Sequence, residues 1–412
     1  MPKCLSVIAL ALGLGATPSI GRAQAAVWSE DRVIARAAER APDVQRAAAS
    51  LRASQAIVAY SNVPIVGNPV IGVRTMFGVP DQSAATYSVL LGIPIDISGQ
   101  RGYWRTEAGF AVQQAEASLQ AAVNDARAAG RLALIDLASA EANVVIATEQ
   151  VSTARELLER MTVRVQAQAS TALDVALSER ELGEAEADLA AARRDRELAA
   201  GRFRAALDLD PGEAVMVAAL SQCSLPNGVG RDQVVARALA RRREAVVFAA
   251  SASRLRASTR RLRAGAISPL MFNGEFEAQG NSNTQWNFGT SFQWALPIMQ
   301  LAQGERAVAS GEAFAADTQR TTTERGIGRE AAVAWNTLVQ HIEEVTALSS
   351  RALPAAQRTL QLTDRLFESG SVDYFRVLQA RRAFFSIRFR VLAAERDAWR
   401  ARANLDRALG DS

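Results

Sequence analysis

The side chains that could carry chemistry are few and lie apart along the chain. There is one histidine, His341, and there are two cysteines, Cys4 and Cys223. A metal site or a general base needs several such groups close together, and His341 instead falls on the apolar face of a predicted helix. We interpret His341 as a packed or pore-adjacent side chain, and the sequence predicts no cofactor, no metal site and no enzyme activity.

Nucleotide-binding loops are also missing from the sequence. No Walker-type pattern occurs, and Gly326-Ile327-Gly328 is flanked by helix-forming residues without a strand before it. If the protein takes part in an energy-driven process, the energy would therefore have to come from elsewhere.

Three acidic residues, Asp364, Glu368 and Asp373, gather near the end of a predicted helix. In a symmetric assembly they would form rings of like charge at a constriction, and such rings favour cations. The alternative is a solvated helix face paired with Arg365, and charge clusters of this kind more often have that role.

Residues 1–25 have the features of a signal peptide. Lys3 precedes an apolar run over 5–16 that is too short to span a bilayer, and Ala23-Gln24-Ala25 is an A-x-A cleavage site. No later stretch is long and apolar enough for a transmembrane helix, so we expect export from the cytoplasm. Cys4 would be lost with this segment, which leaves Cys223 without a disulfide partner.

Charge and composition exclude some classes of protein. The formal net charge is +4, and removing Lys3 and Arg22 leaves 4 − 2 = +2. Acids and arginines interleave along the chain, so the pattern argues against a nucleic-acid partner. High alanine content with only 6% aromatic residues predicts long, closely packed helices.

Short echoes at one spacing indicate an internal duplication. Val33–Ala37 returns as Val234–Ala238, Leu51-Arg52-Ala53-Ser54 returns at 255–258, and Ile93-Pro94-Ile95 returns as Leu296-Pro297-Ile298. We predict a first repeat over 26–210, a linker over 211–230, a second repeat over 231–410 and a tail at 411–412. Each repeat would hold a helix (29–60, 231–263), two strands (67–78 and 84–95, 268–280 and 284–297), a very long helix (100–166, 303–368) and a return helix (172–208, 373–409).

The long helices carry apolar residues three or four apart over their whole length, as in coiled coils. A helix of about 65 residues would extend about 100 Å. No single globular core covers that length, so these helices must pair with other helices.

The strands alternate strictly between apolar and polar residues. This pattern suits a membrane barrel strand that faces lipid on one side, although a half-buried sheet on a soluble core would alternate in the same way. Four strands are too few to close a barrel, and an open sheet in lipid would leave its edges unpaired. We therefore expect several copies to share one barrel, with eight strands from two copies or twelve from three. The candidate lipid-facing residues are Phe272, Trp286, Phe288, Phe292, Trp294, Tyr87, Val89 and Leu91.

This element order resembles that of the TolC-like outer-membrane efflux family over the whole mature chain. The segment 366–382 is similar to the family's turn into the return helix, and 405–410 to its chain end. The strand-to-helix junction over 93–101 is similar to that of the CzcC-like heavy-metal efflux branch.

The resemblance implies a mainly α-helical fold with duplicated long hairpins in an α-barrel and four transmembrane β-strands per chain, closed as a homotrimer. It implies an exit duct in the outer membrane with a long periplasmic part. The duct would contact outer-membrane lipid, a periplasmic adaptor and a proton-driven or ATP-driven inner-membrane pump. The alternative is a periplasmic adaptor or coiled-coil scaffold, which the duplication and the tryptophan-bearing strand disfavour.

The hairpin tips are the expected adaptor-docking sites by this resemblance, and the three acids would sit at the periplasmic constriction. The two tips differ, because Gln168 stands where the second repeat has Gly370. The candidate docking residues are Gln168, Ala169, Ser170 and Thr171 in the first tip and Ser369, Gly370, Ser371 and Val372 in the second.

Overall fold

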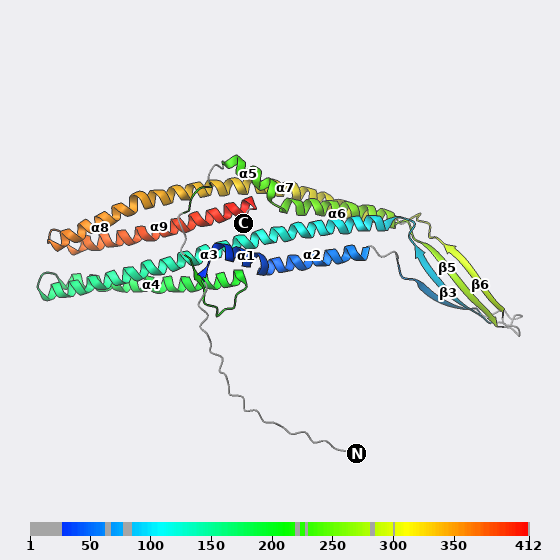
Figure 1. The fold of residues 1–412 in the computed structure, drawn as a ribbon, viewed down its shortest axis with the longest axis horizontal. Helices are drawn as coiled ribbons and strands as arrows, with labels where there is room; N and C mark the ends of the chain where they lie inside the picture. The colour runs from blue at the N-terminus through cyan, green and yellow to red at the C-terminus, as the bar shows by residue number, and fades with distance from the viewer. Residues whose placement is uncertain are drawn as a thin grey trace, which may run out of the picture.

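The computed structural model is an elongated bundle with helical tips at one end and a sheet at the other (Figure 1). It describes residues 27–61, 67–76, 85–218, 223–226, 230–280, 285–299 and 301–410. The first repeat holds β1 (Val27–Trp28), α1 (Glu30–Arg40), α2 (Pro42–Ser61), β2 (Val70–Met76), β3 (Ala85–Ile95), α3 (Gln100–Gln166) and α4 (Ala172–Leu207). β4 (Met216–Val217) lies between the repeats. The second repeat holds α5 (Arg231–Arg241), α6 (Glu244–Gly265), β5 (Leu270–Gly280), β6 (Gln285–Gln293), α7 (Gln303–Ala347), the π turn η1 (Leu348–Ala352), α8 (Leu353–Glu368) and α9 (Tyr374–Leu409).

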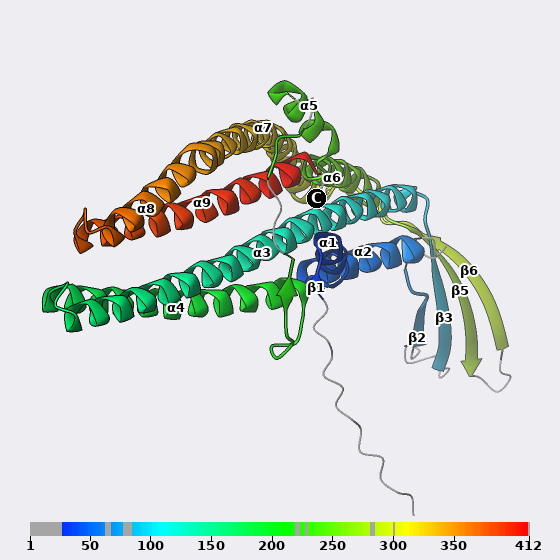
Figure 2. The ribbon, with the colours of Figure 1, turned by 60° about the vertical axis from the view of Figure 1, so that its left-hand side comes forward.

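The same order of elements therefore occurs twice, and the two long hairpins lie side by side (Figure 2). Predicted strands and long helices fall within a few residues of the observed ones. The single helix predicted over 29–60 was wrong, because Ala41 leaves the helical conformation before Pro42 and separates α1 from α2. The helix predicted over 231–263 is likewise broken between α5 and α6.

Backbone conformation repeats along with element order. Six residues of the described chain have positive φ, and they form three pairs at spacings of 202 or 203 residues. Gly99 pairs with Ala302, Gln168 with Gly370, and Asp208 with Gly410. One member of every pair is a glycine, the residue for which positive φ carries no Cβ penalty. The second copy of each turn has thus kept its shape although its side chain changed.

The second long helix contains an extra residue. Buried Ala147 corresponds to buried Leu348 at a spacing of 201, whereas buried Ala154 corresponds to buried Ala356 at 202. The added residue falls at η1, where the N–H of Leu353 donates to the carbonyl of Leu348. One-residue insertions into α-helices are commonly absorbed as π turns. Long helix α3 shows no such interruption across its 67 residues.

The four long strands form one antiparallel sheet in the order β2-β3-β5-β6. Its centre joins the two repeats, because β3 pairs with β5 along eleven residues, from Ala85 opposite Gly280 to Ile95 opposite Leu270. β1 and β4 make a separate small parallel pair. β1 lies at the start of the predicted first repeat, and β4 lies in the predicted linker.

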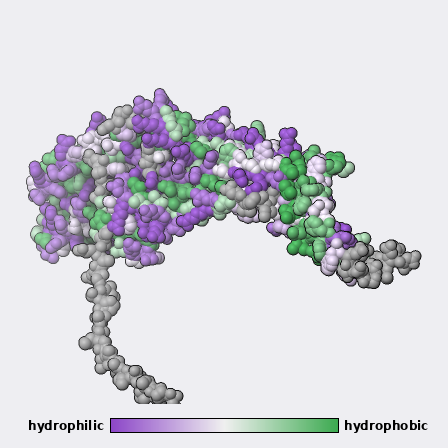
Figure 3. Space-filling model, turned by 45° about the vertical axis from the view of Figure 1, so that its right-hand side comes forward, coloured by the Kyte–Doolittle hydropathy of each residue, from purple (hydrophilic) through white to green (hydrophobic). Residues whose placement is uncertain are grey.

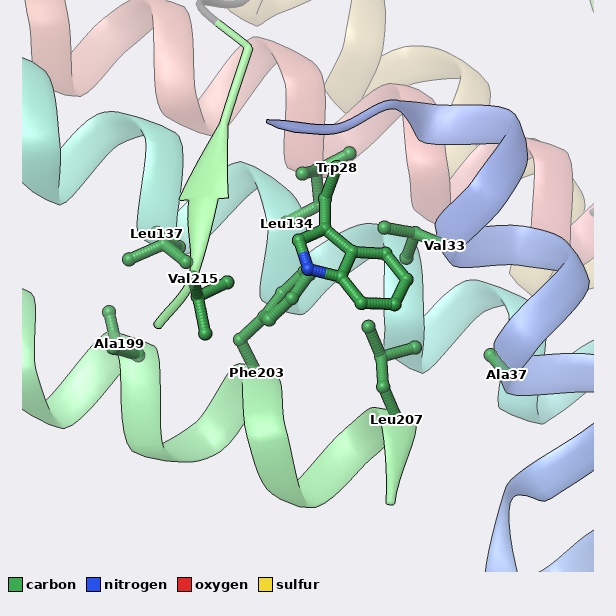
Figure 4. Packing of buried hydrophobic residues seen from close by; sticks show 10 residues of the cluster. Trp28, Val33, Ala37, Leu134, Leu137, Ala199, Phe203, Leu207 and Val215 are labelled. Atoms are coloured by element: carbon green, nitrogen blue, oxygen red, sulfur yellow. The ribbon is translucent and has the colours of Figure 1, made fainter. Parts of the chain in front are cut away.

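A compact core lies midway along the molecule, where α1 crosses α3 and α4 (Figure 4). Trp28 packs edge-on against Phe203 with ring centroids 5.8 Å apart. Gly130 lets α1 approach α3, since a Cβ there would lie 3.0 Å from the Cβ of Ala37 and 3.2 Å from Cγ1 of Val33. In the second repeat, 201 residues later, Ala331 occupies this place.

Some expectations fall outside the described residues. The predicted signal peptide over 1–25 and the tail at 411–412 are among them. In the described part of the chain, no helix contains an apolar stretch that is long enough to cross a membrane.

Enlarging residue 130 should loosen the central core. We expect Gly130→Leu to lower the free energy of unfolding by about 1–3 kcal/mol, because the side chain would overlap α1. Gly326→Ala is the matched control, since its Cβ would meet no neighbouring atom and an alanine favours the helix. Urea unfolding of the detergent-solubilised protein measures both changes, and equal effects of the two variants would contradict this account of Gly130.

Candidate functional site

One face of the four-stranded sheet is apolar and largely exposed. Paired residues share a face, so Val73, Val89, Phe276 and Phe288 form one continuous row across all four strands. Val73 and Phe288, on the outer strands, are 73% and 75% exposed. Figure 3 shows hydrophobic surface gathered over this end of the molecule. Such an extended apolar surface marks contact with lipid or with another protein.

The predicted lipid-facing residues lie on or beside this face. Ring pairs stack along it, with Phe276 and Trp286 centroids 5.1 Å apart and Phe272 and Phe292 centroids 5.2 Å apart. Trp294 follows the end of β6, and its Nε1 donates to the carbonyl of Ser268 at 3.2 Å. Tyr87, Val89 and Leu91 are all exposed on β3.

The opposite face is polar. Arg74 of β2 lies 4.0 Å from the Glu275 carboxylate of β5. Asn273 is buried beside Gly92, where a Cβ would come 2.8 Å from its Oδ1. The sheet thus separates an apolar surface from a polar one most clearly on β5 and β6, whereas Val70, Met76 and Leu90 of β2 and β3 add apolar side chains to the second face.

The outer strands β2 and β6 each have a strand neighbour on one side only, among the residues that the structure describes. Each therefore offers a row of unpaired N–H and C=O groups, which is the template for pairing with a further strand.

The junction between sheet and helices is fixed by Asp96. Its carboxylate accepts from the N–H and the hydroxyl of Ser98 at 2.9 and 2.8 Å, and from the N–H of Arg101 at 3.4 Å. Burial alone would raise the pKa of Asp96, but these hydrogen bonds outweigh it and hold the pKa below its ordinary value of 3.8. Gly99 turns the chain through positive φ into α3.

The two hairpin tips have the same backbone turn. In the first, the N–H of Ala169 donates to the Arg164 carbonyl at 2.8 Å, with Gln168 at positive φ. In the second, the N–H of Ser371 donates to the Leu366 carbonyl at 2.8 Å. This is the Schellman termination of a helix. The predicted difference between the tips is therefore one of side chains and not of backbone path.

Different residues cap the return helices. Thr171 forms a capping box with Asp174 at the start of α4. At the corresponding place before α9, the side chain of Asp373 accepts the N–H of Arg376 at 3.2 Å.

The three acids of the candidate constriction have separate surroundings in one chain. Asp373 is a helix cap, Glu368 is exposed, and Asp364 lies 3.4 Å from Arg381 of α9. The partner of Asp364 is thus Arg381 and not the predicted Arg365. His341 is half-buried on α7, with its Nδ1 3.5 Å from Glu344.

The tips of the two hairpins also touch each other. The hydroxyls of Ser178 and Tyr374 lie 2.7 Å apart in a buried hydrogen bond between α4 and α9. The guanidinium of Arg164 lies over the ring of Phe367, 4.6 Å from its centroid. Burial raises the pKa of Tyr374 despite its bond to Ser178.

Ion pairs continue this contact along the whole of α9. Four of its arginines reach acids of the first hairpin: Arg382 to Glu184 at 2.7 Å, Arg388 to Glu149 at 2.7 Å, Arg400 to Asp136 at 2.9 Å and Arg407 to Asp125 at 2.8 Å. We call these four pairs the α9 ladder. Each pair is partly exposed and contributes little alone, but together they fix which faces of the repeats meet.

Sequence analysis had missed the α9 ladder and the Ser178–Tyr374 bond. Arg382, Arg400 and Arg407 are 18 and 7 residues apart, close to whole numbers of helical turns, and so lie on one face of α9. Arg388 lies about 120° away around the helix. The spacing does not identify the acids that these arginines reach.

Similarity to known proteins now identifies part of the chain. Residues 234–411 match the family model "Outer membrane efflux protein". This match covers most of the predicted second repeat. No curated protein matches the chain in sequence.

Solved structures extend the likeness to the whole fold. The outer-membrane channel OprN superposes with a TM-score of 0.77 at 19% identity, covering 93% of this chain and 90% of that one. VceC of Vibrio cholerae gives 0.75 at 15% identity, with 92% and 96% covered. The CmeC channel of Campylobacter jejuni gives 0.76 at 13%, with 93% and 85% covered. The chain therefore has the mainly helical fold of TolC-like outer-membrane channels.

The family and these neighbours are channels and not enzymes. In the described part of the chain, no three His, Cys, Asp or Glu side chains gather as they would around a metal ion.

Removing the Asp96 carboxylate should loosen the first turn of α3 in a pH-dependent way. Folding lowers the pKa of Asp96. The carboxylate therefore stabilises the folded state above pH 3.8, and this stabilisation is lost as the pH falls through the lower pKa of the folded state. We expect Asp96→Ala to speed amide exchange in this turn at pH 7, by an amount below about 1 kcal/mol because the site is largely exposed.

The internal control is the first turn of α7, where Gln303 accepts the N–H of Leu301 and no carboxylate caps the turn. Its exchange should not change. Hydrogen exchange read by mass spectrometry measures both turns, and an Asp96→Ala effect that grows at low pH would contradict the assignment.

Proposed function

We propose that this protein is the outer-membrane exit duct of a tripartite exporter. Three copies would close a twelve-stranded barrel in the outer membrane, and their helical hairpins would form one tunnel through the periplasm. The observation that carries the proposal is the sheet of β2, β3, β5 and β6, which is apolar on one face, polar on the other and unpaired at both edges.

Physical constraints of the bilayer support this arrangement. A sheet in lipid must have every backbone N–H and C=O paired, and only a closed barrel provides that. Four strands cannot close, whereas about eight or more can. Three copies give twelve strands with an apolar outer wall and a lumen lined by the face that carries Arg74, Asn273 and Glu275.

The long helices would serve as the periplasmic wall. At 67 residues, α3 extends about 100 Å beyond the sheet. Such a length spans an aqueous compartment between two membranes. The tips 168–171 and 369–372 would lie farthest from the outer membrane, and we propose that they receive a periplasmic adaptor joined to a proton-driven or ATP-driven inner-membrane pump.

We further propose that cargo is selected by these partners and not by the duct. The junction around Asp96 resembles the heavy-metal branch of the family, and metal cations are therefore one candidate cargo. The walls of the described chain offer no gathered His, Cys, Asp or Glu ligands with which to choose a metal. Passive conduction fits such walls better than binding.

The cellular location and the channel activity can be tested together. We expect the protein to fractionate with the outer membrane, to run as an oligomer that heating dissociates, and to give stepwise conductance in planar bilayers. Phe288→Arg, midway along the outer strand β6 on the apolar face, should reduce outer-membrane assembly, because a lipid-facing arginine costs about 2–4 kcal/mol. Asn287→Arg, on the polar face, is the matched control. A soluble periplasmic monomer would contradict the proposal.

The acidic constriction is a separate prediction. We expect the combined variant Asp364→Asn, Glu368→Gln and Asp373→Asn to lower cation preference in planar bilayers if the three acids form rings at the tip. Asparagine at 373 still caps α9, so the fold is retained. Unchanged conductance and unchanged reversal potential in a salt gradient would remove the ring from the account.

A further inference from the structure

The end of α6 that adjoins the sheet is strongly basic. Five arginines and no acid lie between residues 254 and 263. The corresponding stretch of α2, 204 residues earlier, holds a single arginine, Arg52. The fold that the two repeats share therefore does not require this charge.

Three exposed arginines near the sheet have no acidic partner. They are Arg260 and Arg263 of α6 and Arg105 of α3. Their neighbour Arg261, by contrast, pairs with Glu107 of α3, with Nε and Oε2 2.6 Å apart. Among the residues that the structure describes, no Asp or Glu lies within ion-pair distance of the three. Their charge is therefore available to an anion from outside the chain.

The packing of α6 on α3 brings these three arginines to one level. The two helices run antiparallel, because Arg261 meets Glu107 and a Cβ added at Gly265 would lie 2.7 Å from Nε2 of Gln100. Arg105 is therefore level with the other two arginines, within about one helical turn along the axis. Three guanidinium groups at one level form a single basic cluster.

The cluster lies on the outer side of the helices. α1 packs on α3 at Gly130, and Arg105 lies 25 residues earlier, close to seven helical turns and so on the same side. On α6, Arg260 lies about 170° around the helix from the mean direction of Val247 and Phe248, which line a groove on the side away from α1. In the proposed duct α1 lies outside the tunnel, because a helix that crossed inside would obstruct it.

The cluster also lies just beyond the sheet, at the depth of lipid headgroups. β5 has eleven residues, and at a tilt of about 45° it covers about 25 Å, the height of the apolar band of a membrane barrel. Arg105 lies five residues into α3, about 8 Å along its axis, and headgroups occupy about 5–8 Å beyond the hydrocarbon core. Its side chain leans toward the N-terminus of α3 and hence toward the sheet. Ile97 and Ile267, in the two junctions between strand and helix, are 49% and 39% exposed, so the outer surface changes from apolar to basic as it does at a membrane interface.

We infer that Arg105, Arg260 and Arg263 bind the phosphate headgroup of an anionic phospholipid in the inner leaflet of the outer membrane. This rests on the proposed function, which places the sheet in lipid. Guanidinium groups form paired hydrogen bonds with phosphate, and basic clusters beside membrane-spanning segments attract anionic lipids. The exposed isoleucines of the junctions contact the acyl chains. Because α2 lacks the arginines of α6, each chain has one such site.

Native mass spectrometry of the detergent-extracted oligomer, with phosphatidylglycerol added, tests the site. We expect one tightly bound lipid per chain, and weaker binding of phosphatidylcholine with the same acyl chains. The combined variant Arg105→Gln, Arg260→Gln and Arg263→Gln should weaken phosphatidylglycerol binding at least about tenfold. Replacement of all three by lysine should retain most of the binding, because the charge is kept. Inorganic phosphate at the concentration of the lipid should not displace it, since it lacks acyl chains.

Three exposed arginines elsewhere supply a control of equal charge. Arg193→Gln, Arg351→Gln and Arg358→Gln together remove the same charge from the long hairpins, far from the sheet. This variant should bind phosphatidylglycerol as the natural protein does. An equal loss in both glutamine variants would show that net charge, and not the cluster, attracts the lipid, and it would overturn the inference.

Further outcomes separate the inference from the function on which it rests. A heat-dissociable outer-membrane oligomer that binds phosphatidylglycerol equally in all variants overturns the inference and leaves the duct intact. The same holds if the glutamine variant of the cluster binds lipid normally but shifts the reversal potential of the channel, because the arginines would then line the lumen. A protein that is absent from the outer membrane even with its natural residues overturns the proposed function itself.

Discussion

The unpaired edges of the sheet are the constraint on which the structure depends. In the proposed function, the apolar face formed by residues such as Val73 and Phe288 lies in lipid, which offers no hydrogen bonds, yet β2 and β6 each expose a row of backbone donors and acceptors. In lipid each unsatisfied group costs several kcal/mol, so the edges must find strands. One chain supplies four, which is too few. On the proposed function, association of copies would complete the barrel that a single chain only begins.

Duplication gives one chain two halves of the same architecture. The two repeats keep the same element order and the same positive-φ turns, and they meet through β3 and β5 in the sheet and through the α9 ladder in the hairpins. Charged contacts of the α9 ladder link the repeats within the chain. The repeats have also diverged, since the π turn at 348–352 has no counterpart in α3.

The sequence predicted those helices and strands that are determined by local residue patterns. Period-two alternation located the strands, and the three-four spacing of apolar residues located α3 to within its end residues. The break at Ala41-Pro42 was missed because the apolar pattern runs through it. The π turn was missed because one inserted residue barely disturbs that pattern. Partners of Arg382 or Tyr374 were beyond reach, because they lie about two hundred residues away and only the packing of the repeats brings them together.

Candidate functional residues could likewise be predicted only where local sequence patterns determine their position. The alternation predicted which residues share the exposed apolar face of the sheet. The acids near the tip were grouped by sequence proximity, and the fold gives Asp364 and Asp373 different partners. A passive duct needs shape and a closed wall more than it needs reactive groups, which agrees with the scarcity of His and Cys in the chain.

The most direct test of the central claim is the mass of the particle extracted from the outer membrane in mild detergent, measured by native mass spectrometry. The full sequence has a mass of 44.1 kDa, and loss of the predicted signal peptide would remove 25 of its 412 residues, about 6%, so particles of one, two and three chains are easily resolved. Closure of one barrel by three copies predicts a single particle of three chains. A stable particle of one chain would contradict the account, because a four-stranded sheet would then persist in the membrane with both edges unpaired.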